Sequence, residues 1–142
     1  MIALGSDHGG YDLKIKVKEF LESKGYECKD YGCYDKSSCD YPDFGRAAAM
    51  AVANGECEKG VVVCTTGIGI SMVANKVKGV RCALCTDPFM AKMTRLHNDA
   101  NVLALGGSIT GELESLDIVD TFFATEFSNE EKHCRRIGKI EE

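Results

Sequence analysis

The sequence contains no apolar run that approaches the roughly 20 residues needed for a membrane-spanning helix. No basic segment with a small-residue cleavage site follows Met1, so nothing there predicts a secretory signal. We therefore expect a cytoplasmic protein with no membrane partner.

Positive charge is also scarce. The chain has 17 Lys and Arg against 22 Asp and Glu, which gives a net charge of −5. Nucleic-acid binding needs a positive face, so this balance predicts no nucleic-acid partner. An anionic ligand should instead be small and held by a local group of donors.

Internal repeats, low-complexity tracts and linkers are absent too. The 142 residues are 44% hydrophobic and 27% charged, which are ordinary globular values that exclude disorder as the main state. We expect a single domain over residues 1–142. The chain has eight cysteines, and several of them (Cys64, Cys82 and Cys85) lie in apolar runs. Without a secretion signal they are expected to be reduced thiols.

What the chain does contain is an alternation of strand and helix patterns. Apolar runs predict strands at residues 2–4, 26–31, 61–64, 80–85 and 102–105, with helical patterns between them. This alternation predicts a three-layer α/β/α sandwich with a five-stranded parallel sheet, which is a Rossmann-like α/β fold.

Capping signals mark several of the helices. Gly25 should end the first helix, and Pro42 should open the second, which runs to residues 54–55. A short helix is expected over residues 71–76, and Asp87 before Pro88 resembles an N-cap. Apolar residues at helical spacing predict a long amphipathic helix with Leu113, Leu116, Val119, Phe122 and Phe123 on its buried face. Ser128 and Glu131 fit a capping box for a last helix.

Ligands of parallel α/β sheets bind at the carboxyl ends of the strands. One such end reads CTTGIGIS from Cys64 to Ser71, where a thiol precedes a helix N-terminus. Backbone amides there can lower the pKa of a thiol and hold a forming oxyanion, and glycines let a ligand approach closely. The alternative is a buried cysteine followed by an ordinary Gly-rich turn.

Three other activities do not fit these strand ends. A cysteine-dependent phosphatase loop needs Arg where Ile70 stands, and a P-loop needs a Gly-Lys-Ser/Thr ending that this segment lacks. A response-regulator receiver needs an Asp in place of Cys64 and a Lys after the fifth strand, where residues 106–108 read Gly-Gly-Ser.

Further polar groups are candidates for a site. Asp7 and His8 follow the first strand, where they can orient a hydroxyl or meet a phosphate, or serve only as a turn and cap. The fifth strand is preceded by His97, Asn98 and Asp99. This segment either places an acid or base toward a pocket or is only the polar end of a helix.

Two remaining clusters have simpler alternatives. Cys82 and Cys85 have metal-like spacing, but residues three apart on a strand point to opposite faces, so we expect no metal site. Lys132 and Arg136 share one helix face and form either a phosphate clamp or a solvated helix end.

These segments together resemble ribose-5-phosphate isomerase type B, within the ribose/galactose phosphate isomerase family. The resemblance covers essentially the whole chain. It rests on the segments GSDHGGYDLK at 5–14, DYP at 40–42, CTTGIGIS at 64–71 with ANK at 74–76, and HNDANVL at 97–103.

The resemblance implies an aldose–ketose isomerase that uses neither metal nor organic cofactor. It would interconvert D-ribose 5-phosphate and D-ribulose 5-phosphate through an enediolate, in the non-oxidative pentose phosphate pathway. The family's cysteine-type members have their base at the position of Cys64, and the Glu of the other type would fall at Ile70. Family members are dimers or tetramers, so a homo-oligomer with a shared active site is implied.

Site residues follow position by position from the same resemblance. Asp7 and His8 match substrate contacts, Thr65, Thr66, Gly67, Ile68 and Gly69 match the anion-stabilising loop, and Thr66 is placed to assist catalysis. His97 matches the acid that opens the furanose ring, Asn98 a neighbouring contact, and Lys132 with Arg136 the phosphate-binding residues.

Two departures leave the substrate open. Thr65 replaces the Gly usual after the base, where a positive φ is expected, and Ser108 stands at a substrate-binding position where many members carry Arg. A hexose 6-phosphate, such as that of allose or galactose, is the alternative within the class. A non-catalytic phosphosugar-binding module is the alternative outside it.

Overall fold

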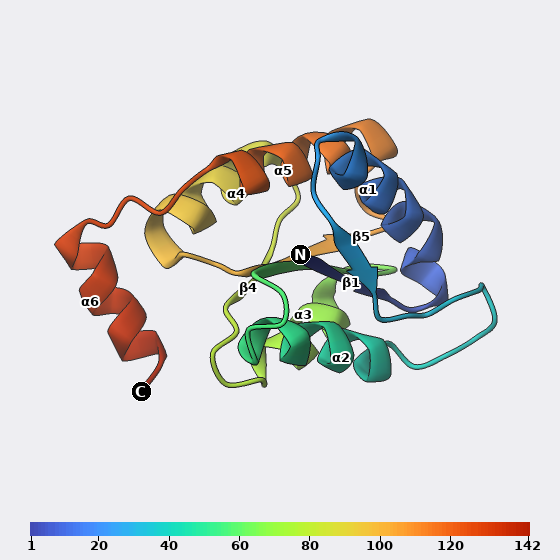
Figure 1. Cartoon of the computed structure of the whole chain (residues 1–142), viewed down its shortest axis with the longest axis horizontal. Coiled ribbons are helices and arrows are strands. Elements are labelled where there is room, and N and C mark those ends of the chain that lie inside the picture. Colours follow the sequence, from blue (N-terminus) through green and yellow to red (C-terminus); the bar gives the residue numbers. More distant parts are fainter.

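Helices cover both faces of a five-stranded parallel sheet in the computed structural model, which describes residues 1–142 (Figure 1). The sheet order is β2-β1-β3-β5-β4. The strands are β1 Ile2–Ser6, β2 Cys28–Asp30, β3 Lys59–Cys64, β4 Cys82–Leu84 and β5 Val102–Gly106. The helices are α1 Tyr11–Ser23, α2 Tyr41–Ala53, α3 Ile68–Asn75, α4 Pro88–Met93, α5 Glu112–Ala124 and α6 Glu131–Ile140. A 3₁₀ turn, η1, spans His8–Gly10, and a π-helical turn, η2, spans Thr94–Asn98. The predicted three-layer fold is confirmed.

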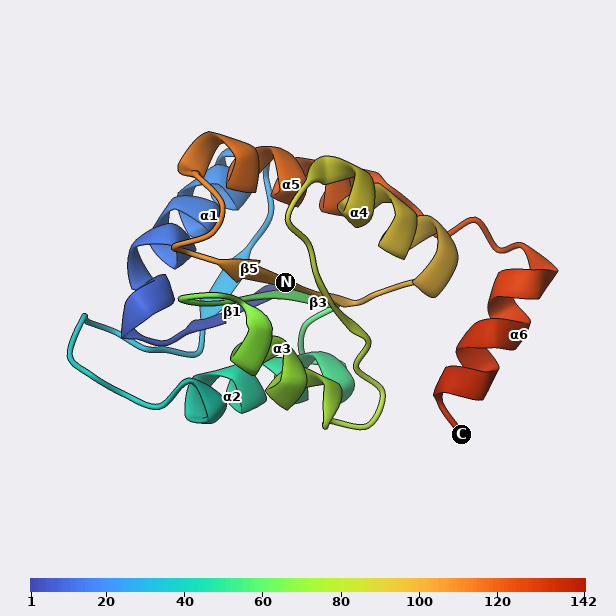
Figure 2. The same cartoon turned by 180° about the vertical axis from the view of Figure 1, so that it is seen from behind.

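Alternate residues of the central strands enter two separate cores. Val61 and Val63 of β3 pack with α1, α4 and α5 on one face, while Val62 and Cys64 pack with α2 and α3 on the other. This follows from the two-residue period of a strand. The Cys64 side chain therefore lies on the second of these faces. Helices α2 and α3 cover that face of the sheet (Figures 1 and 2).

Several local predictions are wrong. The third helix begins at Ile68 instead of Ser71, so the helix follows directly on the loop after β3. The second and fourth strands, predicted over 26–31 and 80–85, are confined to β2 and β4, and each of these edge strands has one strand neighbour. Leu113 is 84% exposed because it lies on the solvent side of α5, whereas Val119 and Phe122 are buried as expected.

The capping box at the last helix is also wrong. Helix α6 begins at Glu131 after Glu130, which makes no side-chain cap. The Ser128 hydroxyl instead donates to the carbonyl oxygen of Leu96 at 2.7 Å. The Ser128 hydroxyl therefore bonds to a residue distant in the sequence and not to the first turn of α6. This hydrogen bond holds the segment before α6 against η2.

Helix α6 stands apart from the three layers (Figures 1 and 2). Its main packing partner is η2, and His133 is its one buried residue. No helix in the structure combines the length and apolarity that a membrane span requires.

Candidate active site

Cys64 is the last residue of β3 and is buried at the start of a tight loop. The backbone N–H of Gly67 donates to its sulfur at 3.1 Å. Helix α3 begins one residue later, so the amides of its first turn continue from that donor. Donors and a helix N-terminus both favour negative charge nearby, so the loop is built to accept an anion.

The loop depends on a glycine at position 67. Gly67 has φ +78°, and a Cβ there would lie 2.6 Å from the Leu84 side chain and 2.8 Å from the Leu105 carbonyl carbon. The positive φ that we expected at Thr65 is therefore wrong, because the chain makes its left-handed turn two residues later. Thr65 fits the loop without the backbone strain that its side chain seemed to imply.

The end of β1 lies against this loop. A carboxylate oxygen of Asp7 accepts the Gly10 N–H at 3.0 Å, which makes Asp7 the cap of η1. A Cβ at Gly9 would come within 2.2 Å of the Thr65 hydroxyl, so the Gly9 backbone packs directly against the Thr65 side chain. His8 is exposed beside them, and its Nδ1 accepts the backbone N–H of Cys39 at 3.2 Å.

The end of β5 joins the same group. The N–H of Gly107 donates to the Cys64 carbonyl at 2.8 Å, and that of Ser108 donates to the Thr65 carbonyl at 3.0 Å. Thr66 is exposed, and its hydroxyl accepts the Ile68 N–H at 3.2 Å. The carboxyl edge of the sheet thus brings together most predicted site residues: Asp7, His8, Cys64, Thr65, Thr66, Gly67, Ile68, Gly69 and Ser108.

The other predicted residues lie at the opposite, amino edge. His97 and Asn98 end η2 before β5 begins, and both are exposed. The His97 ring stacks on His133 of α6, with centroids 4.3 Å apart and planes 20° from parallel. Lys132 and Arg136 are exposed on that same helix. The amino-edge group therefore consists of His97, Asn98, Lys132 and Arg136.

These two groups are too far apart to act together within one chain. Strands β3 and β5 run in register, with Gly60 opposite Val102 and Cys64 opposite Gly106. At about 3.3 Å per residue, a strand as long as β5 separates the two edges by roughly 15 Å. Proton transfer needs contacts of about 3 Å. Cys64 and His97 can therefore meet at one substrate only if the second group comes from another copy.

Two arginines that we did not predict hold the segments at the amino edge together by hydrogen bonds. Arg95 is buried, and its guanidinium donates to Asp99 Oδ1 at 2.7 Å and to the Thr125 carbonyl at 3.0 Å. Arg81 donates to the Asn98 carbonyl at 2.8 Å and to Glu141 at 2.9 Å. The only sequence signal for Arg81 is a lone charge at the start of an apolar run.

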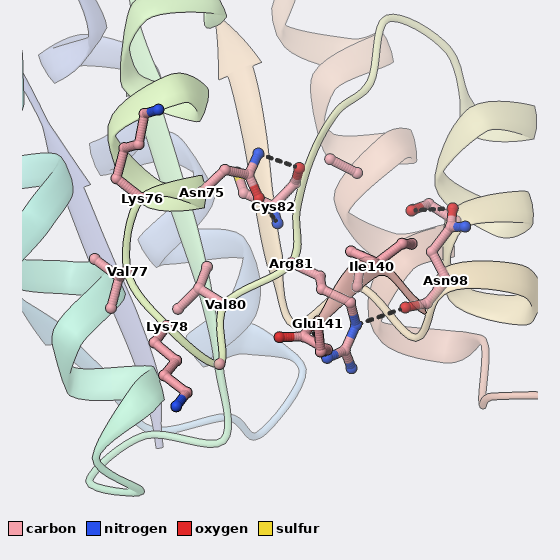
Figure 3. Close-up of a pocket in the computed structure, with 14 residues that line it drawn as sticks. Asn75, Lys76, Val77, Lys78, Val80, Arg81, Cys82, Asn98, Ile140 and Glu141 are labelled. Atoms are coloured by element: carbon pink, nitrogen blue, oxygen red, sulfur yellow. Dashed lines mark hydrogen bonds and ion pairs between the residues drawn. The ribbon is translucent and has the colours of Figure 1, made fainter. Parts of the chain in front are cut away.

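A pocket of about 540 Å³ lies beside Arg81. Figure 3 shows Arg81 bonded to Asn98 on one side and near the end of α6 on the other. The remaining lining comes from residues 75–80, 82–83, 94 and 100. The Arg81 guanidinium is committed to protein acceptors, so its role is to fix Asn98 and α6 relative to each other.

Cys82 and Cys85 do not converge, as predicted from their strand spacing. Cys85 belongs to the core beneath α1, α4 and α5, whereas Cys82 packs against the core beneath α2 and α3. All eight cysteines are free thiols.

Acidification is expected to weaken the docking of α6. Burial, reinforced by the neighbouring His97, lowers the pKa of His133 below its ordinary 6.5, although Glu130 acts in the other direction. The unfolded chain then takes up a proton at a higher pH than the folded chain. Stability should therefore fall as the pH drops through about 6.5, and the loss should level off below the folded pKa.

Melting temperatures measured from about pH 7.5 to about pH 5 test this expectation. His133→Gln has no such titration, so its melting temperature should fall less over that interval. Equal falls in the two proteins would contradict the assignment.

Comparison with known proteins agrees with this fold and loop. The ribose/galactose isomerase family model matches residues 2–140. The chain is 53% identical to a solved ribose-5-phosphate isomerase B of Clostridium thermocellum, with a TM-score of 0.97 over 99% of this chain and 94% of that one. Ribose-5-phosphate isomerase B of Escherichia coli is 38% identical over 98% of this chain and 93% of its own length. The galactose-6-phosphate isomerase subunit LacB of Clostridium acetobutylicum is 43% identical over 100% of this chain and 82% of its own.

The fold and the thiol-bearing loop define an α/β enzyme of the isomerase class. The chain belongs to the ribose/galactose isomerase family.

Proposed function

We propose that this protein interconverts D-ribose 5-phosphate and D-ribulose 5-phosphate, with the Cys64 thiolate as the base. The observation that carries the proposal is the bond from the Gly67 N–H to the Cys64 sulfur at the start of α3. It supplies a hydrogen-bond donor to the sulfur and places amides where an oxyanion can develop. Likeness to two ribose-5-phosphate isomerases B supports the choice of substrate.

The chemistry requires one proton to move between neighbouring carbons. Cys64 removes the proton from C2 of the open-chain aldose, and the electron pair forms the C1–C2 double bond of an enediolate. The same thiol returns the proton to C1, while the hydroxyl proton moves from O2 to O1. Thr66 and the amides from Gly67 to Gly69 hold the negative oxygen, and Asp7 and His8 orient the hydroxyls. No metal or organic cofactor is needed for these steps.

We also propose that the active unit is a homo-oligomer, at least a dimer. The two groups of site residues lie at opposite sheet edges, and each lacks what the other contains. Two-fold symmetry would bring the carboxyl-edge group of one copy against the amino-edge group of its partner, twice. Exposed apolar side chains near the loop, Ile68, Met72, Phe89 and Met90, fit a face that a second copy covers.

In this arrangement the partner copy completes the reaction. His97 of the partner protonates the ring oxygen as the furanose opens, and Asn98 adds a contact to the sugar. Lys132 and Arg136 hold the phosphate, whose binding energy orients the distant reacting carbons. These two cations on one helix face provide the local positive charge that a phosphate dianion requires in a chain with a net negative charge.

Arg136→Ala is expected to lower kcat/KM roughly 10- to 100-fold, because a charged hydrogen bond contributes about 1.5–3 kcal/mol. Inorganic phosphate should inhibit the wild type competitively and the variant less. Arg135→Ala is the matched control, since Arg135 is already paired with Glu131 at 2.9 Å and should be dispensable. If neither Arg136→Ala nor Lys132→Ala changes kcat/KM or phosphate inhibition, the cluster is only a solvated helix end.

A hexose 6-phosphate is the second candidate substrate. Ser108 leaves a small side chain at an edge where a longer sugar needs room, and a galactose-6-phosphate isomerase subunit is 43% identical to this chain. Assays of the purified protein against ribose, allose and galactose phosphates, with and without EDTA, decide between them. The proposal expects the highest kcat/KM with ribose 5-phosphate and no effect of EDTA. Failure with every aldose phosphate would leave a non-catalytic binding module.

A further inference from the structure

Lys14 is a buried cation that the proposed reaction does not use. It is 1% exposed on α1, between the core residues Leu13 and Val17. Its ammonium donates to Asp30 Oδ1 at 2.8 Å and to the carbonyl oxygen of Cys33. Burying an ammonium is unfavourable unless it is paired and hydrogen-bonded, so these two acceptors account for its presence.

The two acceptors lie where β2 ends and the segment that connects β2 to α2 begins. Asp30 Oδ1 also accepts a hydrogen bond from the Gly32 N–H at 2.8 Å. The Cys33 N–H donates to the Ser6 carbonyl at 2.8 Å, which fastens the segment to the end of β1. Lys14 therefore anchors residues 30–33 against the strand that leads to Asp7 and His8.

The far end of the same segment reaches His8. The Cys39 N–H donates to Nδ1 of His8 at 3.2 Å. A backbone N–H can only donate, so Nδ1 carries no proton and the neutral ring carries its proton on Nε2. The neutral His8 ring thus offers an Nε2–H donor at the carboxyl edge of the sheet, one residue before Gly9, whose backbone packs against Thr65.

The chain between the two ends is itself tied together. The Cys33 thiol donates to the backbone carbonyl of Asp35 at 3.2 Å. The Ser37 N–H donates to the Asp35 carboxylate at 2.9 Å. Lys36 pairs with Asp12 of α1 at 2.9 Å. These contacts order the segment from residue 33 to residue 37, two residues before the Cys39 amide.

We propose that Lys14 is a positioning residue: by anchoring Asp30 and the Cys33 carbonyl, it holds the Cys39 amide where it keeps His8 as the Nε2–H tautomer. The inference rests on the proposed role of His8 as a substrate contact. Its structural part, the tautomer, can be measured without any substrate.

The first test is ¹⁵N NMR of the His8 ring in the wild type and in Lys14→Met. The wild type should show a protonated Nε2 and an unprotonated Nδ1, and Lys14→Met should show a mixture of tautomers. Lys16→Met is the matched control, because Lys16 is exposed on the same helix, and it should match the wild type. An unchanged Nε2–H tautomer in folded Lys14→Met would overturn the proposal.

A second variant covers the case in which Lys14→Met does not fold. Cys39→Pro removes the amide donor and leaves Lys14 in place, so it should produce the same mixture, whereas Cys39→Ala keeps the amide and should not. A pure Nε2–H tautomer in Cys39→Pro would show that the Cys39 amide does not determine the tautomer of the His8 ring.

Kinetics separate positioning from a merely structural role. Lys14→Met should lower kcat/KM about 10-fold, the effect of one lost hydrogen bond. In a His8→Ala background it should cause no further loss, because its effect passes through His8. An equal loss in both backgrounds would assign Lys14 to folding alone. If the protein isomerises no aldose phosphate, the proposed function fails while the NMR result still decides the tautomer.

Discussion

Cys64→Ala is expected to lower turnover about 10²- to 10⁴-fold, the usual contribution of a general base. Its sulfur is the acceptor of the Gly67 N–H, and no other titratable side chain is bonded at that loop. The lost volume is small and the residue ends a strand whose core neighbours remain, so the fold should persist.

Cys57→Ala is the matched control for this result. Cys57 is buried in the same core as Cys64, but it precedes β3 and so lies at the amino edge. Its loss should reduce stability without a specific effect on turnover. Near wild-type turnover in folded Cys64→Ala would remove the thiol from the mechanism.

His97→Asn should lower kcat/KM for the furanose form of ribose 5-phosphate by about 10²-fold or more, because ring opening would lose its acid. Asparagine keeps a polar side chain at this exposed position, so η2 should survive. The later proton transfer by Cys64 should be much less affected.

Solvent hydrogen exchange at C1 of open-chain ribulose 5-phosphate separates these two steps, since this ketose needs no ring opening. His97→Asn should retain most of the exchange rate. If exchange falls as far as the full reaction, His97 acts on the proton transfer and not on the ring.

The sequence was informative where a structural feature depends on residues that are close together along the chain. The apolar run at 61–64 predicted the end of β3 at Cys64, whereas β1 continues two residues beyond its predicted run to Ser6, next to Asp7. It was also informative about Asp87, whose carboxylate accepts the Met90 N–H at 2.8 Å as a cap should. The resemblance added the roles of residues that local pattern could not assign.

The sequence was less informative where a partner lies far along the chain. Ser128 bonds to Leu96, 32 residues away, and Lys14 bonds to Asp30, 16 residues away, so neither contact has a local pattern. The separation of Cys64 from His97 also required the register of β3 and β5. The sequence placed Cys64 at the end of one strand and His97 before another, but the distance between them needed the pairing of the two strands.

Mixing two inactive variants tests the central proposal most directly. Cys64→Ala and His97→Asn chains are unfolded together, refolded, and assayed with ribose 5-phosphate. In a mixed dimer one site carries both substitutions and the other carries neither. Random pairing should therefore restore about one quarter of the wild-type activity. No activity above that of the separate variants would contradict a thiol and an imidazole contributed by different copies.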